Sequence, residues 1–239
     1  MNYEEFGKEI LEKVYDKYKR ECKDCLLINH KYKHSLEVLE VMKEICEGER
    51  IKNKQIAYLI ALWHDLGRFE QALKYGHFID FKSEDHAELS VKMLDNLGIW
   101  KKIPEKWEDT IKFAIQNHNK IRINGGEGEK LLMAKLIRDA DKVANFLHYP
   151  PLPQKYEKKP PKKHIVKSII EGELINIKQV ESEQDMLALR ISMLFDINFK
   201  TSWHILEKNH IIEKLIQNLE TDEETKNKIM EKIMSEQPA

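Results

Sequence analysis

An ionisable pair ends the most apolar segment of the chain. Residues 58–63 read YLIALW, and His64 and Asp65 follow directly. A buried carboxylate without a partner is costly, so it should be paired with a cation or bound to a metal. Neutral imidazole is the commonest metal ligand, and carboxylates complete sites for hard cations. The pair therefore indicates a metal site, placed where Gly67 is expected to end a helix so that both side chains can turn toward one ion.

Further ionisable residues occupy positions where a hydrophobic side chain would pack better. Each lies on an apolar stripe of a different expected helix. A lone histidine in such a place is usually an ordinary core residue, but several on separate helices of a bundle can point at one centre. These residues are His34, His86, His118 and Asp141. Together with His64 and Asp65 they predict a shared metal centre.

Helical periodicity runs through most of the chain and predicts an all-α bundle. Ser83 is expected to cap the helix that carries His86 in its first turn, and Pro104 stands where another helix could begin. The segment 172–180 alternates weakly and could form a short strand. The expected helices include residues 6–18, 34–45, 57–64, 107–118, 131–146, 186–199, 202–209 and 211–219.

Proline placement predicts the domain organisation. Five of the seven prolines fall between Pro150 and Pro161, so residues 150–163 are expected to form a Pro/Lys-rich connector. Residues 1–149 would then form the helical core that carries the metal site. The additional C-terminal helices, residues 164–239, are expected to pack on this core or to form a homodimer interface.

Composition excludes several classes of protein. The formal charge is −1, so nothing indicates a nucleic-acid polymer as partner, and no apolar run is long enough to span a membrane. The first ten residues lack the features of a secretory signal. Three cysteines do not suggest a disulfide framework. Cys22 and Cys25 could form half a zinc site or a redox pair, but no second CxxC follows, so they are expected to be ordinary reduced residues in a cytoplasmic protein.

The ordered set His34, His64-Asp65 and Asp141 resembles the HD-domain superfamily of metal-dependent phosphohydrolases over roughly residues 30–147. The most specific piece is HDLGR at residues 64–68, which matches the family's H-D-small apolar-G-K/R. The resemblance implies that the four residues hold one metal ion. In two-metal members two further histidines lie between the HD pair and the last aspartate, and His86 and His118 match that order. It therefore implies a two-ion site bridged by Asp65.

Two ligand positions have alternatives. Asp139 and Asp141 each share a face with apolar residues, so periodicity does not choose between them; the family pattern of an Ala-Asp pair favours Asp141. His30 and His34 lie one helical turn apart, and His34 fits the family pattern better. His30 would then lie beside the site or be exposed.

The resemblance implies hydrolysis of a small phosphoester, such as a nucleotide, by metal-activated water. The cofactor would be two divalent transition-metal ions, chosen from Fe, Mn, Zn, Ni or Co. Asp65 and Arg68 are the expected catalytic residues, since the guanidinium of Arg68 matches phosphate geometry; the alternative is a salt bridge to a carboxylate such as Glu70. His77 and Asp80, in the connection 73–85, and Lys120 are further candidates for substrate contact, against the alternative of ordinary surface residues.

Two other functions fit the same motif. A few HD-domain proteins use the six-ligand pattern to hold two irons that activate oxygen, which makes a di-iron oxygenase one alternative. The other is a binding or regulatory module in which the metal is a structural staple. Iron content and oxygen consumption would identify the first, and absence of phosphoester turnover in the metal-loaded protein would favour the second.

Overall fold

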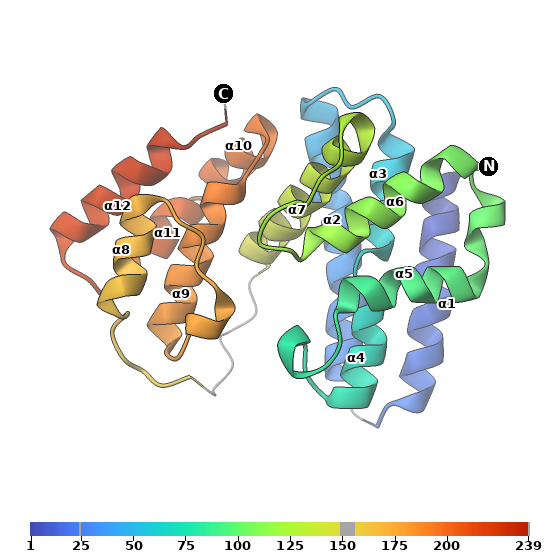
Figure 1. Cartoon of the computed structure of the whole chain (residues 1–239), viewed down its shortest axis with the longest axis horizontal. Coiled ribbons are helices and arrows are strands. Elements are labelled where there is room, and N and C mark those ends of the chain that lie inside the picture. Colours follow the sequence, from blue (N-terminus) through green and yellow to red (C-terminus); the bar gives the residue numbers. More distant parts are fainter. Residues whose placement is uncertain (24, 149–155, 239) are drawn as a thin grey trace. The chain divides into compact units, whose positions relative to one another are not determined.

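The computed structural model describes residues 1–23, 25–148 and 156–238. Helices dominate these residues and no strand occurs among them, which confirms the all-α prediction. The chain divides into two compact units, Met1–Ala144 and Asn145–Ala239 (Figure 1). The first unit contains every residue predicted to carry chemistry.

The first unit is a helical bundle whose most buried member is α3. Every residue of α3 from Ile56 to Trp63 except Tyr58 is buried, because α1, α2 and α6 all pack against it. This explains the unbroken apolar run in the sequence. The helices are α1 (Tyr3–Glu21), α2 (Leu26–Gly48), α3 (Lys54–Trp63), α4 (Gly67–Tyr75), α5 (His86–Leu97), α6 (Glu105–His118) and α7 (Gly128–Leu147), with short 3-10 helices at Asp80–Lys82 and Ile99–Lys102.

Local signals at the helix ends place the site residues. As expected, α3 ends at Trp63, directly before the HD pair, and α6 begins after Pro104. The prediction that Ser83 caps α5 is wrong. Asp85 is the N-cap instead and accepts a hydrogen bond from the backbone of Ala87, so that His86 becomes the first residue of the helix.

The second unit is also helical. Residues 172–180 form no strand; they contain a 3-10 helix at Ile177–Gln179, so the expected strand is wrong. The bounds of the longer helices are α8 (Lys163–Glu171), α9 (Glu183–Ser192), α10 (Lys200–Lys208), α11 (Ile211–Gln217) and α12 (Glu223–Ser235), and a further 3-10 turn spans Met193–Asp196. Of the expected connector 150–163, residues 150–155 lie outside the described residues. Packing of this unit on the core, and a homodimer through it, stay predictions.

The cysteines differ from expectation. Cys22 and Cys25 form a disulfide, so the prediction that both are reduced is wrong for this structure. They lie in the turn between α1 and α2, which brings their Cα atoms to 5.7 Å, a separation that a disulfide can span. Cys46 is a free, buried thiol whose pKa burial raises to about 12. Among the described residues, none of the helices has the length and apolar character needed to cross a membrane.

Candidate metal centre

Asp65 lies at the middle of the candidate site and presents its two carboxylate oxygens to two different groups. It sits in the turn 64–66 between α3 and α4 and is almost fully buried. Oδ2 lies 3.8 Å from Nε2 of His34 and 3.6 Å from Nε2 of His64. Oδ1 lies 3.2 Å from Nε2 of His86 and 3.6 Å from Nε2 of His118. A carboxylate in this orientation can bridge two cations.

The first group combines His34 from α2, His64 from the end of α3 and Asp141 from α7. Their potential ligand atoms all lie within 4.8 Å of one another. Oδ1 of Asp141 is 2.9 Å from Nε2 of His34 and 3.8 Å from Nε2 of His64. The two histidines are buried, whereas the Asp141 side chain is 24% exposed. The group is thus buried on one side and open to solvent at Asp141.

The second group forms where α5 begins and α6 ends. His86 is the first residue of α5 and His118 is the last residue of α6. Their Nε2 atoms are 2.9 Å apart, and both rings are buried. His64, Asp65 and His118 also form a set whose potential ligand atoms lie within 4.8 Å. The structure therefore brings together all six predicted ligands, with Asp65 between the two groups.

In three of the histidines, a hydrogen bond at Nδ1 leaves Nε2 free to bind a cation. Nδ1 of His64 donates to the carbonyl of Ala61 (2.8 Å), and Nδ1 of His118 donates to that of Ile115 (2.6 Å). Nδ1 of His86 lies 2.8 Å from Oδ2 of Asp80. Because these oxygens only accept, each Nδ1 carries the proton and each neutral ring keeps its Nε2 lone pair for the centre.

The electrostatics also fit a cation. Burial alone would raise the pKa of Asp65, but Lys31 and His64 hold it well below its usual range. A hydrogen bond from Nε2 of His34 likewise holds the pKa of Asp141 well below its usual range against the effect of burial. Burial lowers the pKa of His118 to about 4. Two ionised carboxylates thus lie among imidazoles, and Nε2 of His64 is a buried nitrogen for which the described residues supply no hydrogen-bond partner. The donor set is suited to divalent transition metals.

Asp80 connects the second group to the connection between α4 and α5. Its Oδ2 holds His86, and its Oδ1 accepts from Nη1 of Arg68 (2.8 Å) and from Nε2 of Gln71 (3.0 Å). The Asn119 amide reaches the same carboxylate at 3.2 Å. Sequence reasoning proposed Asp80 only as a substrate contact. The structure shows instead a carboxylate that orients a candidate ligand.

The predicted substrate-binding residues lie in different surroundings. Nη1 of Arg68 donates to Asp80 and not to Glu70. Nε of Arg68 lies 3.7 Å from Oδ1 of Asp65 and is buried without a hydrogen-bond acceptor among the described residues. Lys120 pairs with the α5 cap Asp85. His77 accepts a hydrogen bond from the backbone of Ile79. Arg68 therefore faces the centre, and roles for Lys120 and His77 stay predictions.

The structure favours one member of each pair of alternative ligands. Asp141 lies in the first group, whereas buried Asp139 belongs to none of the candidate metal groups found among the described residues. His34 is buried in the same group, and His30 is exposed on the preceding helical turn with its ring stacked 6.3 Å from that of His34. Asp141 and His34 therefore stay the proposed ligands.

Lys31 is a site residue that sequence reasoning missed. Its Nζ lies 2.7 Å from Oδ2 of Asp65, the shortest contact that this carboxylate makes with a charged side chain of the described part. The Lys31 side chain is only 12% exposed. A signal was present, since Lys31 precedes His34 by three residues and the two therefore share a helix face. Its positive charge stabilises the ionised carboxylate.

The hydroxyl of Ser90 joins the backbone of residues 64–67 to α5. The hydroxyl of Ser90 accepts from the backbone N–H of Gly67 and lies 2.8 Å from the carbonyl oxygens of both His64 and His86. The Gly67 Cα approaches α5 so closely that a Cβ there would overlap the His86 carbonyl and lie 2.6 Å from Leu89 Cβ. The motif glycine thus permits the backbone approach that brings His64 and His86 to one centre.

Comparison with known proteins agrees with this geometry. Residues 32–145 match the family model of the HD domain. The matched segment contains all six candidate ligands and Arg68, and it begins one residue after Lys31. No curated protein and no solved structure matches the chain.

Proposed function

The chain contains an HD domain, of the superfamily of metal-dependent phosphohydrolases, and we propose that it hydrolyses a phosphoester of a nucleotide or a related small molecule. The observation that carries this proposal is the orientation of Asp65. One of its oxygens faces His34 and His64, and the other faces His86 and His118. Two cations bound there would polarise phosphoryl oxygens and lower the pKa of a water molecule toward neutrality.

The side chains beside the centre would bind and orient the phosphoryl group. Arg68 points its buried Nε toward Asp65, and Asp80 and Gln71 hold the far end of its guanidinium. Lys31 brings a second positive charge to the other oxygen of Asp65. An anionic substrate would therefore meet two fixed donors without reorganisation of either side chain, which favours electrostatic stabilisation of the transition state.

The connection 73–85 supports a substrate with an aromatic portion. The ring of Phe78 lies 5.3 Å from Nζ of Lys31 and 5.6 Å from Cζ of Arg68, so an apolar ring adjoins both candidate phosphate-binding cations. Tyr75 and His77 stack within the same connection, with ring centroids 6.1 Å apart. Rings beside cations suit recognition of a nucleobase next to its phosphate.

Elemental analysis followed by a substrate panel tests the proposal. The full chain would be loaded separately with Mn, Fe, Co, Ni and Zn, and its metal content measured. Each form would then be assayed for phosphate release from nucleoside phosphates and for cleavage of synthetic phosphomonoesters and phosphodiesters. We expect turnover by at least one form, abolished by chelation and in His64→Ala.

The same experiment separates the alternatives. Oxygen consumption by the reduced iron form, with no hydrolysis by any form, would overturn hydrolysis in favour of an oxygenase. A fully loaded protein without either activity would indicate a binding module in which the metal is structural. Lys106→Ala, an exposed substitution on α6, is the control and should retain the activity of the unmodified chain.

A further inference from the structure

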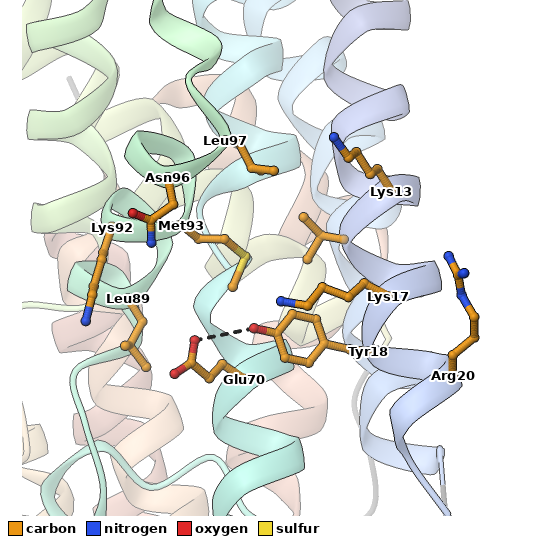
Figure 2. Close-up of a pocket in the computed structure, with 11 residues that line it drawn as sticks. Lys13, Lys17, Tyr18, Arg20, Glu70, Leu89, Lys92, Met93, Asn96 and Leu97 are labelled. Atoms are coloured by element: carbon orange, nitrogen blue, oxygen red, sulfur yellow. Dashed lines mark hydrogen bonds between the residues drawn. The ribbon is translucent and has the colours of Figure 1, made fainter.

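The first unit contains a cavity of about 550 Å³ that belongs to neither group of candidate ligands. Its walls come from α1 and α5, and Glu70 of α4 lies between them (Figure 2). The volume falls within the range of roughly 300–1,000 Å³ that is typical of small-molecule sites. Because none of the 11 lining residues is a candidate metal ligand, the cavity is a separate feature.

The interior of the cavity is largely apolar. Val14 and Tyr18 of α1 face Leu89, Met93 and Leu97 of α5. Val14, Tyr18 and Leu89 are buried, and Met93 and Leu97 are partly buried. Both sets follow helical spacing, so each helix contributes one continuous stripe. Such walls would take an apolar body of aliphatic or aromatic character.

The mouth of the cavity is positively charged. Lys13, Lys17 and Arg20 come from α1 and Lys92 comes from α5, and all four are exposed. Among the described residues, no carboxylate lies within the 4.0 Å that defines an ion pair with any of these four groups. In a chain whose formal charge is −1, four cations without ion pairs around one cavity form a local excess of positive charge. That excess complements an anion.

The single lining carboxylate is already engaged. Tyr18 donates its hydroxyl to Oε2 of Glu70 at 3.3 Å, inside the cavity. In Figure 2, Lys17 and Tyr18 reach from α1 toward Met93 and Glu70. The Tyr18–Glu70 pair gives the apolar interior one polar position. Nζ of Lys17 lies 5.0 Å from the centre of the Tyr18 ring and Nε of Arg20 donates to the Asp16 carbonyl at 3.0 Å, and neither contact neutralises a charge.

We propose that this cavity binds an organic phosphate, with its apolar body between α1 and α5 and its phosphate at Lys17, Lys92 and the neighbouring cations. The shared chemistry is an apolar group joined to a phosphate, and it could come from a nucleotide or from an alkyl phosphate. Binding requires no metal, so it can be measured in EDTA and does not depend on the phosphohydrolase activity proposed above.

Calorimetric titration of the full chain in EDTA tests the site with four probes: AMP, octyl phosphate, inorganic phosphate and 1-octanol. We expect AMP or octyl phosphate to saturate one site, with inorganic phosphate and octanol at least about tenfold weaker because each lacks one half of the ligand. The probe with the higher affinity, AMP or octyl phosphate, shows whether the apolar part of the ligand is a nucleoside or an alkyl chain.

Two sets of variants locate the binding. Lys17→Glu with Lys92→Glu should weaken the preferred probe by about tenfold or more. The matched control, Lys52→Glu with Lys106→Glu, makes the same change in net charge at exposed positions outside the cavity and should leave the affinity nearly unchanged. Met93→Trp should fill the interior and weaken the organic phosphate without changing the binding of inorganic phosphate. Circular dichroism would verify that each variant is folded.

Three results would overturn the proposal. The first is that neither organic phosphate saturates the chain. The second is that both charge-reversed pairs lose affinity equally, which would indicate an effect of net charge alone. The third is that inorganic phosphate binds as tightly as the organic phosphates, which would indicate a surface anion patch. If the Lys17→Glu, Lys92→Glu chain does not fold, the single variants Lys17→Ala and Lys92→Ala replace it, and each should bind the preferred probe more weakly than the unmodified chain.

Discussion

His86 and His118 meet with their Nε2 atoms 2.9 Å apart, one at the first residue of α5 and the other at the last residue of α6. Their Nδ1 protons are committed to Asp80 and to the Ile115 carbonyl, so two lone pairs point at each other. Such an arrangement is unfavourable unless a proton or a cation lies with them. Asp65 Oδ1 adjoins both nitrogens, which makes a bound cation the natural solution.

Asp65 should be required for both ions. We expect about two metal ions per chain by elemental analysis after dialysis, and none in Asp65→Ala, because the substitution removes an oxygen from each group. Asp109→Ala, which removes an exposed carboxylate on α6, is the control and should keep both ions. Full metal occupancy in Asp65→Ala would refute the bridging assignment.

Asp80 should affect only the ion near His86. In Asp80→Asn the carboxylate that polarises His86 becomes a neutral amide, and loss of such a partner typically weakens metal binding by about 10–100-fold. The ion near His34 should bind as before. Competition titration with a metal-binding dye would show one weakened site and one unchanged site.

Asp85→Asn is the matched control for this comparison. Asp85 is a neighbouring, partly buried carboxylate that caps α5 and pairs with Lys120, and asparagine is also a good N-cap. Equal weakening in the two variants would show that general negative charge, rather than the hydrogen bond to His86, sets the affinity.

The sequence was sufficient for the parts of the site that depend on periodicity. His34, His64, His86 and His118 each interrupt an apolar stripe, and burial of those stripes brings them together. Periodicity did not choose between Asp139 and Asp141, which share a helix with apolar residues on both faces, so the family pattern was needed there. Asp80 could not be assigned in the same way, because it lies in the connection 73–85, where no period relates a side chain to a neighbour. Its contact with His86 depends on how that connection folds back.

Local chemistry also limited what could be predicted at two turns. Ser83 and Asp85 are both good N-caps; in the structure Asp85 caps α5, and the Ser83 hydroxyl instead accepts a hydrogen bond from the Gln71 amide. The spacing of Cys22 and Cys25 is compatible with both reduced and disulfide-bonded cysteines. The turn between α1 and α2 brings their Cα atoms to 5.7 Å, which allows the sulfur atoms to bond. The first case involves a contact with a distant residue, and the second a local turn geometry that the spacing alone does not determine.

The metal-free protein should lose stability as the pH falls from about 6.5 to about 4. The pKa of His118 is about 4 when folded, chiefly because of burial, and about 6.5 when unfolded. Between these values the unfolded chain binds a proton that the folded chain does not, so acid favours unfolding. The contribution of His118 is fully present above about pH 6.5 and is lost as the pH falls.

A variant isolates this contribution from those of the other histidines. In EDTA, the fall of Tm between pH 6.5 and 4 should be shallower in His118→Gln than in the unmodified chain. His77→Gln, which lies outside the two groups, should keep the original slope. A His118→Gln chain with an unchanged slope would show that this ring does not control the acid sensitivity.

Gly67→Ala should destabilise the fold through a backbone clash. The new Cβ would overlap the His86 carbonyl and lie 2.6 Å from Leu89 Cβ and 2.8 Å from the Ser90 nitrogen. Backbone and Cβ atoms of a packed helix cannot turn aside, so α4 and α5 must separate, at a cost of about 1–3 kcal/mol or more. Urea unfolding in EDTA would measure the free energy without a metal contribution.

Gly7→Ala is the matched control, because it too places a methyl group inside a helix of the first unit. There the Cβ would meet only side-chain ends, Leu62 Cδ1 at 2.6 Å and Leu59 Cδ2 at 3.0 Å, which can rotate. The gain of about 1 kcal/mol in helix propensity offsets part of that crowding. Gly67→Ala should therefore be the less stable variant, and it should also bind metal more weakly, since His86 moves with α5. Equal stability of the two variants would show that α4 and α5 can separate freely at this point, and the glycine of the HD motif would then need another explanation.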